Sequence, residues 1–219
     1  MKERPILFQG AMVRAILDGS KTQTRRIVKP QPDSRPGMNC TRLIFKDRKG
    51  APLLDEALEA PEPRVYRSLC PYGVPGDQLW VRESHWWFKD EPDHETGYYP
   101  PKLTAEDVVY RADGDDGRKV WRPSIHMPRW ACRLVLEITG VRVERLQDIS
   151  EADAQAEGTP CYVCGEPMTG LSEDDCHCFH RKAMPSDYRA LWQSINGASS
   201  WDANPWVWVV SFRRVDGQP

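Results

Sequence analysis

The feature that most constrains the fold is an apolar segment near the end of the chain, residues 205–212, which reads Pro-Trp-Val-Trp-Val-Val-Ser-Phe. Tryptophan and the β-branched valine favour strands. A continuous apolar run of this length is typical of a strand buried on both faces, so we expect it to be central in a sheet, with its tryptophans on one face. Residues 132–146 alternate β-branched and polar side chains, which predicts strand structure with a bulge or kink at Gly140.

The other expected elements contain no repeated strand-helix-strand unit. Ser150, followed by an acid at position 153, is a capping-box pattern that opens a short helix, which Gly158 closes. Glu157 then lies at the helix end where the dipole disfavours an acid, so its presence there needs another explanation. This order argues against a doubly wound parallel sheet and favours an α+β fold, a small mixed β-barrel with flanking helices. The further predictions are helices at 12–19 and 186–195 and strands at 78–83 and 108–110.

A chain of 219 residues has the length of one domain, and three of its segments resemble insertions. Residues 31–75 are rich in proline and carry mixed charge, so we expect little regular structure there. Residues 87–107 are a second loop, and a cysteine-rich third insertion spans about 159–181. We therefore expect a single domain over residues 1–219 that carries these insertions.

The charge balance excludes one class of protein. The chain has 30 basic and 32 acidic residues and a formal net charge of −2, which argues against a strongly basic protein that coats nucleic acid. No apolar run of about 18 residues is present, and the first residues lead into mixed sequence rather than into the apolar region of a signal peptide. We expect a soluble, cytoplasmic protein with no membrane partner.

Cysteines in the third insertion have the spacing of a metal site. Cys161 and Cys164 form a Cys-x2-Cys pair, and Cys176 and Cys178 follow it. Four thiolates bind Zn²⁺ tetrahedrally, and four protein ligands make such a site structural rather than catalytic. We favour these cysteines as the ligands of one zinc ion. Two alternatives stay open: a loop with chance thiols, and a histidine in place of one cysteine, either His177 or His180.

A polar stretch after the first helix carries groups suited to attack on a carbonyl. Lys21 and Thr24 are three residues apart, so a helical or turn-like arc would bring the amine and the hydroxyl to one side. Arg25 and Arg26 add two fixed positive charges. A lysine that is desolvated or beside other cations loses basicity until it can remove the proton of a hydroxyl nucleophile. The alternative, on spacing alone, is a solvated basic turn.

The same stretch belongs to a wider pattern, Gly19-x-Lys21-x-x-Thr24-x-Arg26, followed by Gly76-Asp77-x-Leu79-x-Val81, by residues 146–157 and by the strand at 206–212. Together with the stretches at 124–130 and 204–208, it resembles the ASCH family of the PUA-like superfamily, in particular its longer, tryptophan-rich members from phages and prophages. The resemblance covers both ends and most of the middle of the chain. It implies a small β-barrel with helices beside a cleft, in a superfamily that binds RNA or modified nucleobases.

The resemblance also implies a catalytic set. Some small family members are amidohydrolases that remove the acetyl group of N4-acetylcytidine, with a lysine, a threonine and a glutamate as catalytic residues. By motif match these are Lys21, Thr24 and Glu157, with Arg26 stabilising the oxyanion. The substrate would be a nucleoside or a base in RNA. Because this chain is longer than the minimal domain, a non-catalytic RNA or modified-nucleobase binding module is the alternative.

Further ligand contacts are expected from aromatic and basic residues outside the motif. Tryptophans near arginines suit base stacking and phosphate neutralisation, although the same tryptophans would also serve to cover the ends of a barrel. Histidine side chains often contact ligands, so His126 is a candidate contact, with a packed, hydrogen-bonded histidine as the alternative. The expected binding residues are Arg25, Arg26, Trp86, His126 and Arg129.

Overall fold

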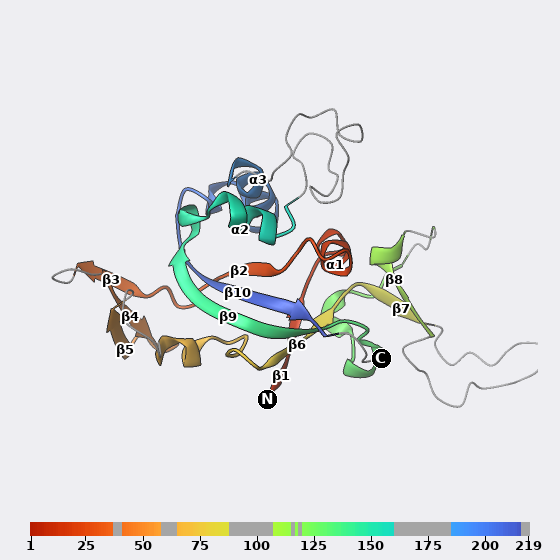
Figure 1. The fold of residues 1–219 in the computed structure, drawn as a ribbon, viewed down its shortest axis with the longest axis horizontal. Helices are drawn as coiled ribbons and strands as arrows, with labels where there is room; N and C mark the ends of the chain where they lie inside the picture. The colour runs from red at the N-terminus through yellow and green to blue at the C-terminus, as the bar shows by residue number, and fades with distance from the viewer. Residues whose placement is uncertain are drawn as a thin grey trace, which may run out of the picture.

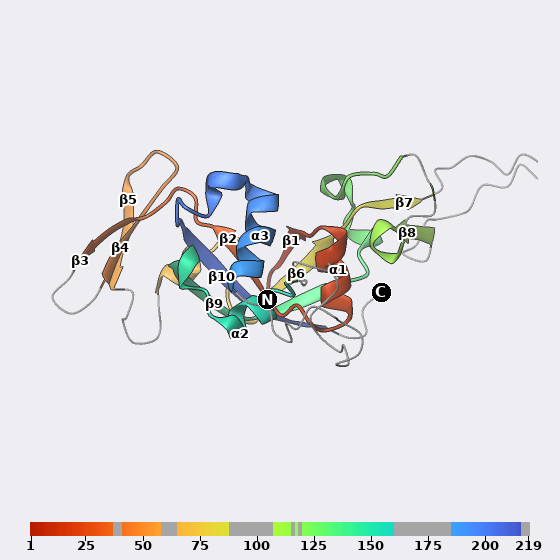
Figure 2. The same ribbon diagram turned by 90° about the horizontal axis from the view of Figure 1, so that it is seen from above.

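The computed structural model describes residues 1–36, 41–57, 65–87, 107–114, 117, 120–159 and 185–215. The protein has an α+β fold in which helices pack on a curved sheet (Figures 1 and 2). The α-helices are α1 (Gly10–Leu17), α2 (Glu151–Ala156) and α3 (Pro185–Asn196). The strands are β1 (Glu3–Leu7), β2 (Gln23–Ile27), β3 (Asp33–Pro36), β4 (Thr41–Lys46), β5 (Pro52–Ala57), β6 (Gln78–Arg82), β7 (His85–Trp87), β8 (Val108–Tyr110), β9 (Val135–Arg145) and β10 (Trp206–Arg214).

The α-helices occur where the sequence predicts them. α1 is followed by Gly19, whose φ of +83° suits the left-handed stop of a helix. Ser150 caps α2, accepting a hydrogen bond from the backbone N–H of Asp153, and the Asp153 carboxylate accepts one in return from the backbone of Ser150. The predicted capping box is therefore confirmed. None of the helices in the described ranges is long and apolar enough to cross a membrane.

Five strands form the main sheet, in the order β1-β6-β9-β10-β2. β1 runs parallel to β6, and the other neighbouring strands are antiparallel. β10 lies between β9 and β2 (Figure 1), so the prediction of a central strand near the end of the chain is confirmed. The described strands do not close into a hydrogen-bonded barrel.

The two faces of β10 belong to two different cores. Trp206 and Trp208 pack in the main core, whereas Val207 and Val209 pack in a second core with Trp192 of α3. The alternation arises because successive side chains of a strand point to opposite faces. α2 and α3 thereby cover one face of the sheet (Figure 1), and the tryptophans share the other face as predicted.

β9 is a single long strand that bends across the sheet. Its pairing with β10 skips a residue, because Ser211 is opposite Gly140 while the next residue, Phe212, is opposite Ile138. The predicted irregularity at Gly140 is confirmed as a bulge, which increases local twist without ending the strand. The curved sheet brings its edge strands near each other, and Nη2 of Arg26 in β2 donates to the backbone carbonyl of Leu7 in β1 at 2.8 Å.

The expectation of little regular structure at 31–75 is wrong. β3, β4 and β5 form an antiparallel sheet there, with Leu43 and Phe45 of the middle strand buried. Phe45 stacks on Trp208 of the main sheet, with ring centroids 5.8 Å apart. Proline was misleading because Pro36 lies in an edge strand and Pro52 begins one, which are the positions where a missing N–H is tolerated.

Besides β2 and the strands of the β3–β5 sheet, two strands have no counterpart among the predicted elements. β1 contains Pro5 and lies at the edge of the main sheet, where a proline is accepted. β7 contains Trp86 and Trp87, for which the sequence predicted a loop, and it pairs with β8. This pair and the small β3–β5 sheet lie at opposite ends of the main sheet in both views (Figures 1 and 2).

Candidate functional site

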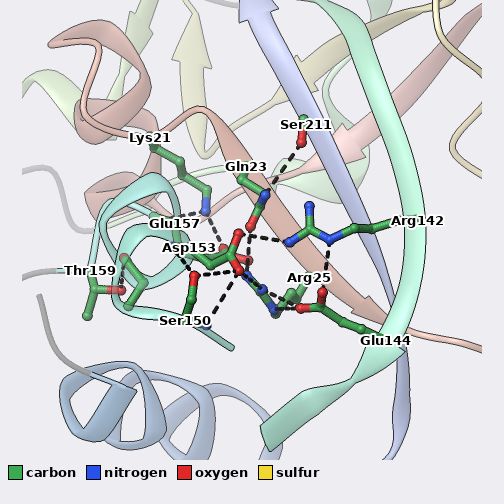
Figure 3. A network of polar contacts seen from close by, with 11 residues as sticks. Lys21, Gln23, Arg25, Arg142, Glu144, Ser150, Asp153, Glu157, Thr159 and Ser211 are labelled. Atoms are coloured by element: carbon green, nitrogen blue, oxygen red, sulfur yellow. Dashed lines mark hydrogen bonds and ion pairs between the residues drawn. The ribbon is translucent and has the colours of Figure 1, made fainter. Parts of the chain in front are cut away.

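A buried ion pair joins the segment before β2 to the end of α2 (Figure 3). Nζ of Lys21 lies 2.8 Å from Oε2 of Glu157 and donates a second hydrogen bond, also of 2.8 Å, to the backbone carbonyl of Glu157. The two residues are only 2% and 3% exposed. Glu157 is the C-cap of α2, so the acid at the unfavourable helix end is explained by the lysine that pairs with it.

The backbone brings these two residues together. Lys21 and Glu157 form an antiparallel bridge, and the amide of Lys21 donates to the carbonyl of Ala15 in α1 at 2.8 Å. Gly158 follows with a φ of +63°, and a Cβ at this position would lie 2.8 Å from Cβ of Lys21 and 2.9 Å from Cβ of Ala15. The close approach of α1 and α2 around the ion pair therefore requires a glycine at position 158.

Arg25 of β2 binds the second carboxylate oxygen of Glu157. Its Nη1 lies 3.2 Å from Oε1 of Glu157, and its Nη2 also pairs with Glu144 of β9 and Asp153 of α2. Arg142 links the same two acids, at 2.9 Å from Glu144 and 2.8 Å from Asp153. Two arginines and one lysine thus face a matching set of carboxylates in one network (Figure 3).

Burial changes the proton affinity of this network unequally. Loss of hydration lowers the pKa of Lys21, and the attraction of Glu157 opposes this shift only in part. Burial also disfavours the charge of Arg25, but the nearby Glu157 and Glu144 outweigh that effect and raise the arginine pKa. The lysine is therefore the cation of the network that can release a proton, while the arginine keeps its charge.

Thr24 lies in β2 at the wall of a pocket. It is opposite Val210 of β10 and is 2% exposed. The pocket has a volume of about 620 Å³, and Thr24 and Glu157 both line it. Its other lining residues are Met12, Arg25, Arg26, Ile27, Lys29, Pro30, Arg48, Pro71, Tyr72, Tyr188, Leu191, Trp192, Ile195 and Asn196.

The geometry around Thr24 differs from the predicted one. The helical or turn-like arc is wrong because Thr24 belongs to a strand, and the solvated basic turn is wrong because Lys21 and Thr24 are buried. Strand alternation places Thr24 and Arg26 on the same face of β2. The Arg26 guanidinium lies 5.2 Å from the centre of the Phe8 ring, and Nζ of Lys21 lies 5.7 Å from it. Lys21 and Arg26 therefore lie near the same aromatic ring, although Lys21 itself does not line the pocket.

Three of the expected binding residues lie away from this pocket. Trp86, His126 and Arg129 are absent from its lining. Arg129 is instead paired with Glu3, 3.0 Å from its carboxylate. His126 is exposed in a short 3-10 helix, so the packed-histidine alternative is wrong. Of the expected ligand contacts, Arg25 and Arg26 line the pocket.

The expected zinc ligands Cys161, Cys164, Cys176 and Cys178 lie outside the described residues. Within the described ranges, no group of three or more histidine, cysteine or acidic side chains is arranged to hold a metal ion. That finding does not bear on the cysteines, so the zinc site stays a prediction.

Several residues of the site were missed by sequence reasoning. Tyr188 and Trp192 of α3 form an aromatic wall of the pocket, and burial raises the pKa of Tyr188 well above its ordinary value. Their helix was predicted, but its helical pattern does not tell which other element it packs on. A signal did exist for Arg142 and Glu144, because two opposite charges on one face of a mostly buried strand call for buried partners.

Comparison with known proteins finds no relative of this chain. No protein-family model matches the chain, and neither the search of curated proteins nor the search of solved structures finds a match.

Proposed function

We propose that the chain is an ASCH-like protein of the PUA-like superfamily, of the longer phage or prophage type, whose single domain spans residues 1–219. In this proposal the main sheet is an incompletely closed form of the family's small β-barrel. The bend of β9 and the hydrogen bond from Arg26 of one edge strand to Leu7 of the other support this interpretation.

The proposed activity is hydrolysis of an acyl amide on a modified cytidine-like base, in a nucleoside or in RNA, of the N4-acetylcytidine type. One observation carries the proposal: Lys21 is buried in an ion pair with Glu157, and Glu157 and Thr24 line the same pocket. A hydroxyl, a lysine of lowered pKa and an orienting carboxylate are the groups that a lysine-activated nucleophile needs.

The hydrogen bonds of Lys21 suit it to act as a base. A neutral amine has two N–H donors and one lone pair. Glu157 accepts two hydrogen bonds from Nζ, one at Oε2 and one at its backbone oxygen. Once the third proton has left, the lone pair is therefore directed away from Glu157. The carboxylate orients the base rather than taking part in the bond-making step.

The reaction proceeds through an ester on Thr24. Lys21 takes the proton of the Thr24 hydroxyl as its oxygen attacks the acyl carbon, and Arg26 stabilises the negative oxygen of the tetrahedral intermediate. The carbon–nitrogen bond then breaks, and the amine of the base leaves with the proton from Lys21. Lys21 then takes a proton from water, whose oxygen attacks the threonine ester. The bond between the acyl carbon and the threonine oxygen breaks, Lys21 returns the proton to that oxygen, and the acid is released.

A non-catalytic RNA or modified-nucleobase binding module is the second candidate. The pocket favours it through its aromatic wall, where Tyr72, Tyr188 and Trp192 lie beside Arg26. Aromatic faces with nearby arginines recognise bases without any chemistry. The two candidates share the pocket and differ in whether Thr24 reacts.

Turnover of N4-acetylcytidine decides between these candidates. Release of cytidine by the purified protein is followed by chromatography, and Thr24→Val, which keeps the side-chain shape, is expected to abolish it. Thr24→Ser keeps a hydroxyl and is expected to retain part of the rate. Thr22→Val is the matched control, because Thr22 is exposed and does not line the pocket. No turnover by the wild type across a set of N4-acylated cytidines would reject the hydrolase.

The zinc site is proposed on the cysteine spacing alone. Elemental analysis is expected to find one zinc per chain, lost in Cys161→Ser. Cys70→Ser is the control, because Cys70 is a buried cysteine of the described core that has no ligand spacing. A fully folded, metal-free preparation of the wild type would contradict the site.

A further inference from the structure

The pocket carries more positive charge than its single described carboxylate balances. Arg25, Arg26, Lys29 and Arg48 line it, and among the described lining residues Glu157 is the one acid. That acid is already bound by Lys21 and Arg25. The lining therefore contains cations whose counter-charge must come from elsewhere.

The buried network does not supply this counter-charge. Its acids Glu144 and Asp153 are engaged by Arg25 and Arg142. Arg26 has neutral partners, since it donates to the Leu7 carbonyl and lies over an aromatic ring. Lys29 and Arg48 are exposed, and neither forms an ion pair within the described part of the chain. Three cations at the pocket are thus left for an anion.

The positions of these cations relate them to the reacting threonine. Arg26 and Lys29 follow Thr24 along β2 and the residues just after it, and Arg48 reaches the pocket from the turn after β4. The aromatic wall comes from Tyr72 and α3. A flat ring for the aromatic wall and an anionic group for the cations therefore suit a ligand of this pocket.

We infer that the ligand of this pocket is a phosphorylated nucleoside, with the base beside Thr24 and the phosphate held by Lys29 and Arg48. The inference rests on the proposed function for the identity of the base and extends it to the substrate class. Arginine and lysine are the side chains that bind phosphate most strongly, and an uncompensated positive surface concentrates anions before they bind. A free nucleoside would leave these cations unused.

The phosphate can belong to a mononucleotide or to a strand of RNA. Both present the same chemistry to Lys29 and Arg48, so they are separated by the substrates of the test. The substrates are N4-acetylcytidine, its 5′-monophosphate and a short oligoribonucleotide that contains one N4-acetylcytidine. Either phosphorylated substrate, if preferred over the nucleoside, supports the inference and identifies the source.

The test compares kcat/KM for the monophosphate with kcat/KM for the nucleoside. We expect a preference of about tenfold or more, the effect of an interaction of about 1.4 kcal/mol. In Lys29→Ala/Arg48→Ala this ratio is expected to fall to about one. Lys49→Ala, an exposed lysine next to Arg48 that does not line the pocket, is the matched control and should keep the wild-type ratio.

A binding measurement keeps this inference separate from the proposed hydrolysis. Calorimetric titration with cytidine and with cytidine 5′-monophosphate needs no turnover. Tighter binding of the monophosphate, lost in the double variant, upholds the inference even if no acyl group is cleaved. Equal affinity and equal kcat/KM for the phosphorylated and neutral ligands in the wild type would overturn it, and hydrolysis of the nucleoside would then leave the proposed function standing.

Discussion

Among the residues that the structure describes, two glutamates are buried beside cations, and their partners differ. Glu157 binds Lys21 and Arg25 at the wall of the pocket. Glu83, which follows β6, accepts two hydrogen bonds of 2.9 Å from the guanidinium of Arg133. The glutamates are 3% and 1% exposed, so burial does not distinguish them.

The comparison teaches that a buried charge alone does not mark a reactive site. Burial raises the pKa of Glu83, although Arg133 opposes the shift, and an arginine does not act as a base because it keeps its proton. Glu83 is also absent from the pocket lining. The Glu157 site differs because its partner is a lysine of lowered pKa and because a hydroxyl and a pocket lie beside it.

The largest expected difference between the two sites is in activity. Lys21→Met is expected to lower kcat/KM for N4-acetylcytidine about 10³-fold, because a positioned base contributes about 10²- to 10⁴-fold. Arg133→Met should leave the rate per folded molecule unchanged, since Arg133 pairs with Glu83 and Asp113, which do not line the pocket. Steady-state kinetics corrected for the folded fraction measures both variants. Equal losses would remove the distinction between the sites.

Substitutions at the two sites should have similar effects on the free energy of unfolding. Glu157→Gln is expected to lower the free energy of unfolding by about 3–5 kcal/mol, because it leaves buried cations without a partner. Lys21→Met/Glu157→Gln should recover part of this loss, since the buried ammonium is then gone as well. Arg133→Met/Glu83→Gln should recover stability relative to Glu83→Gln in the same way. Urea denaturation gives these values, and strictly additive losses at either site would show that the pair is not coupled there.

The pH dependence of the rate should distinguish a lysine site from an arginine site. Because the neutral amine is the base and burial lowers the pKa of Lys21, the rate should rise with pH to a plateau, with an apparent pKa below the ordinary 10.5 of lysine. Glu157→Gln should move this pKa further down, because the carboxylate favours the ammonium form. A profile unchanged by Glu157→Gln would contradict the assignment of Lys21 as the base.

Lowering the pH should change the stability contributions of Asp153 and Glu83 in opposite directions. Burial disfavours ionisation of Asp153, but the hydrogen bond from Ser150 and the charges of Arg142 and Arg25 prevail and lower its pKa from 3.8 to about 2. The unfolded chain then binds this proton first, so the stability from Asp153 is present above pH 3.8 and is lost as the pH falls toward 2. Asp153→Asn should flatten that loss in urea denaturation at acid pH.

Glu83 provides the contrast to Asp153. Its folded-state pKa is raised above 4.5, so its contribution to stability decreases as the pH rises through the window above 4.5. Glu83→Gln should remove this decrease in the same urea denaturation series. Parallel pH profiles for Asp153→Asn and Glu83→Gln would show that the networks do not differ in this respect.

The smallest expected effect concerns salt. Exposed cations are screened, whereas buried pairs are screened much less. Affinity for cytidine 5′-monophosphate should therefore fall modestly between about 50 and 200 mM salt, and Lys29→Ala/Arg48→Ala should remove most of that dependence. The stability difference between wild type and Glu157→Gln should change little over the same range. An affinity that does not depend on salt, together with a stability difference that does, would mean that Lys29 and Arg48 do not hold the phosphate.

Local pattern was sufficient where structure depends on neighbours in sequence. The helix stop at Gly19, the capping box at Ser150 and the bulge at Gly140 all follow from residues within a few positions. β2 could not be predicted in this way. Its polar residues resemble a turn until Arg25 is seen to bind Glu144 and Glu157, which are 119 and 132 positions away.

The candidate site, too, was predictable only in the parts that depend on neighbouring residues. Spacing alone did not separate a reactive Lys21 and Thr24 from a basic turn, and Glu157 entered through the family resemblance. The lining of the pocket depends on how α3 and the segment near Tyr72 pack against β2, which are contacts between distant parts of the chain. The cations Lys29 and Arg48 have no local pattern, because only the folded chain brings both to the lining of one pocket.

The packing of β10 fixes the position of Thr24, the residue proposed to react, within the sheet. A slip of one residue would carry its tryptophans into the helix-covered layer and its valines into the opposite one, and neither layer would fill. The same strand sets Val210 against Thr24 and Val209 against Arg25. The packing of two different cores therefore fixes the position of Thr24 relative to α2, the helix that ends at Glu157.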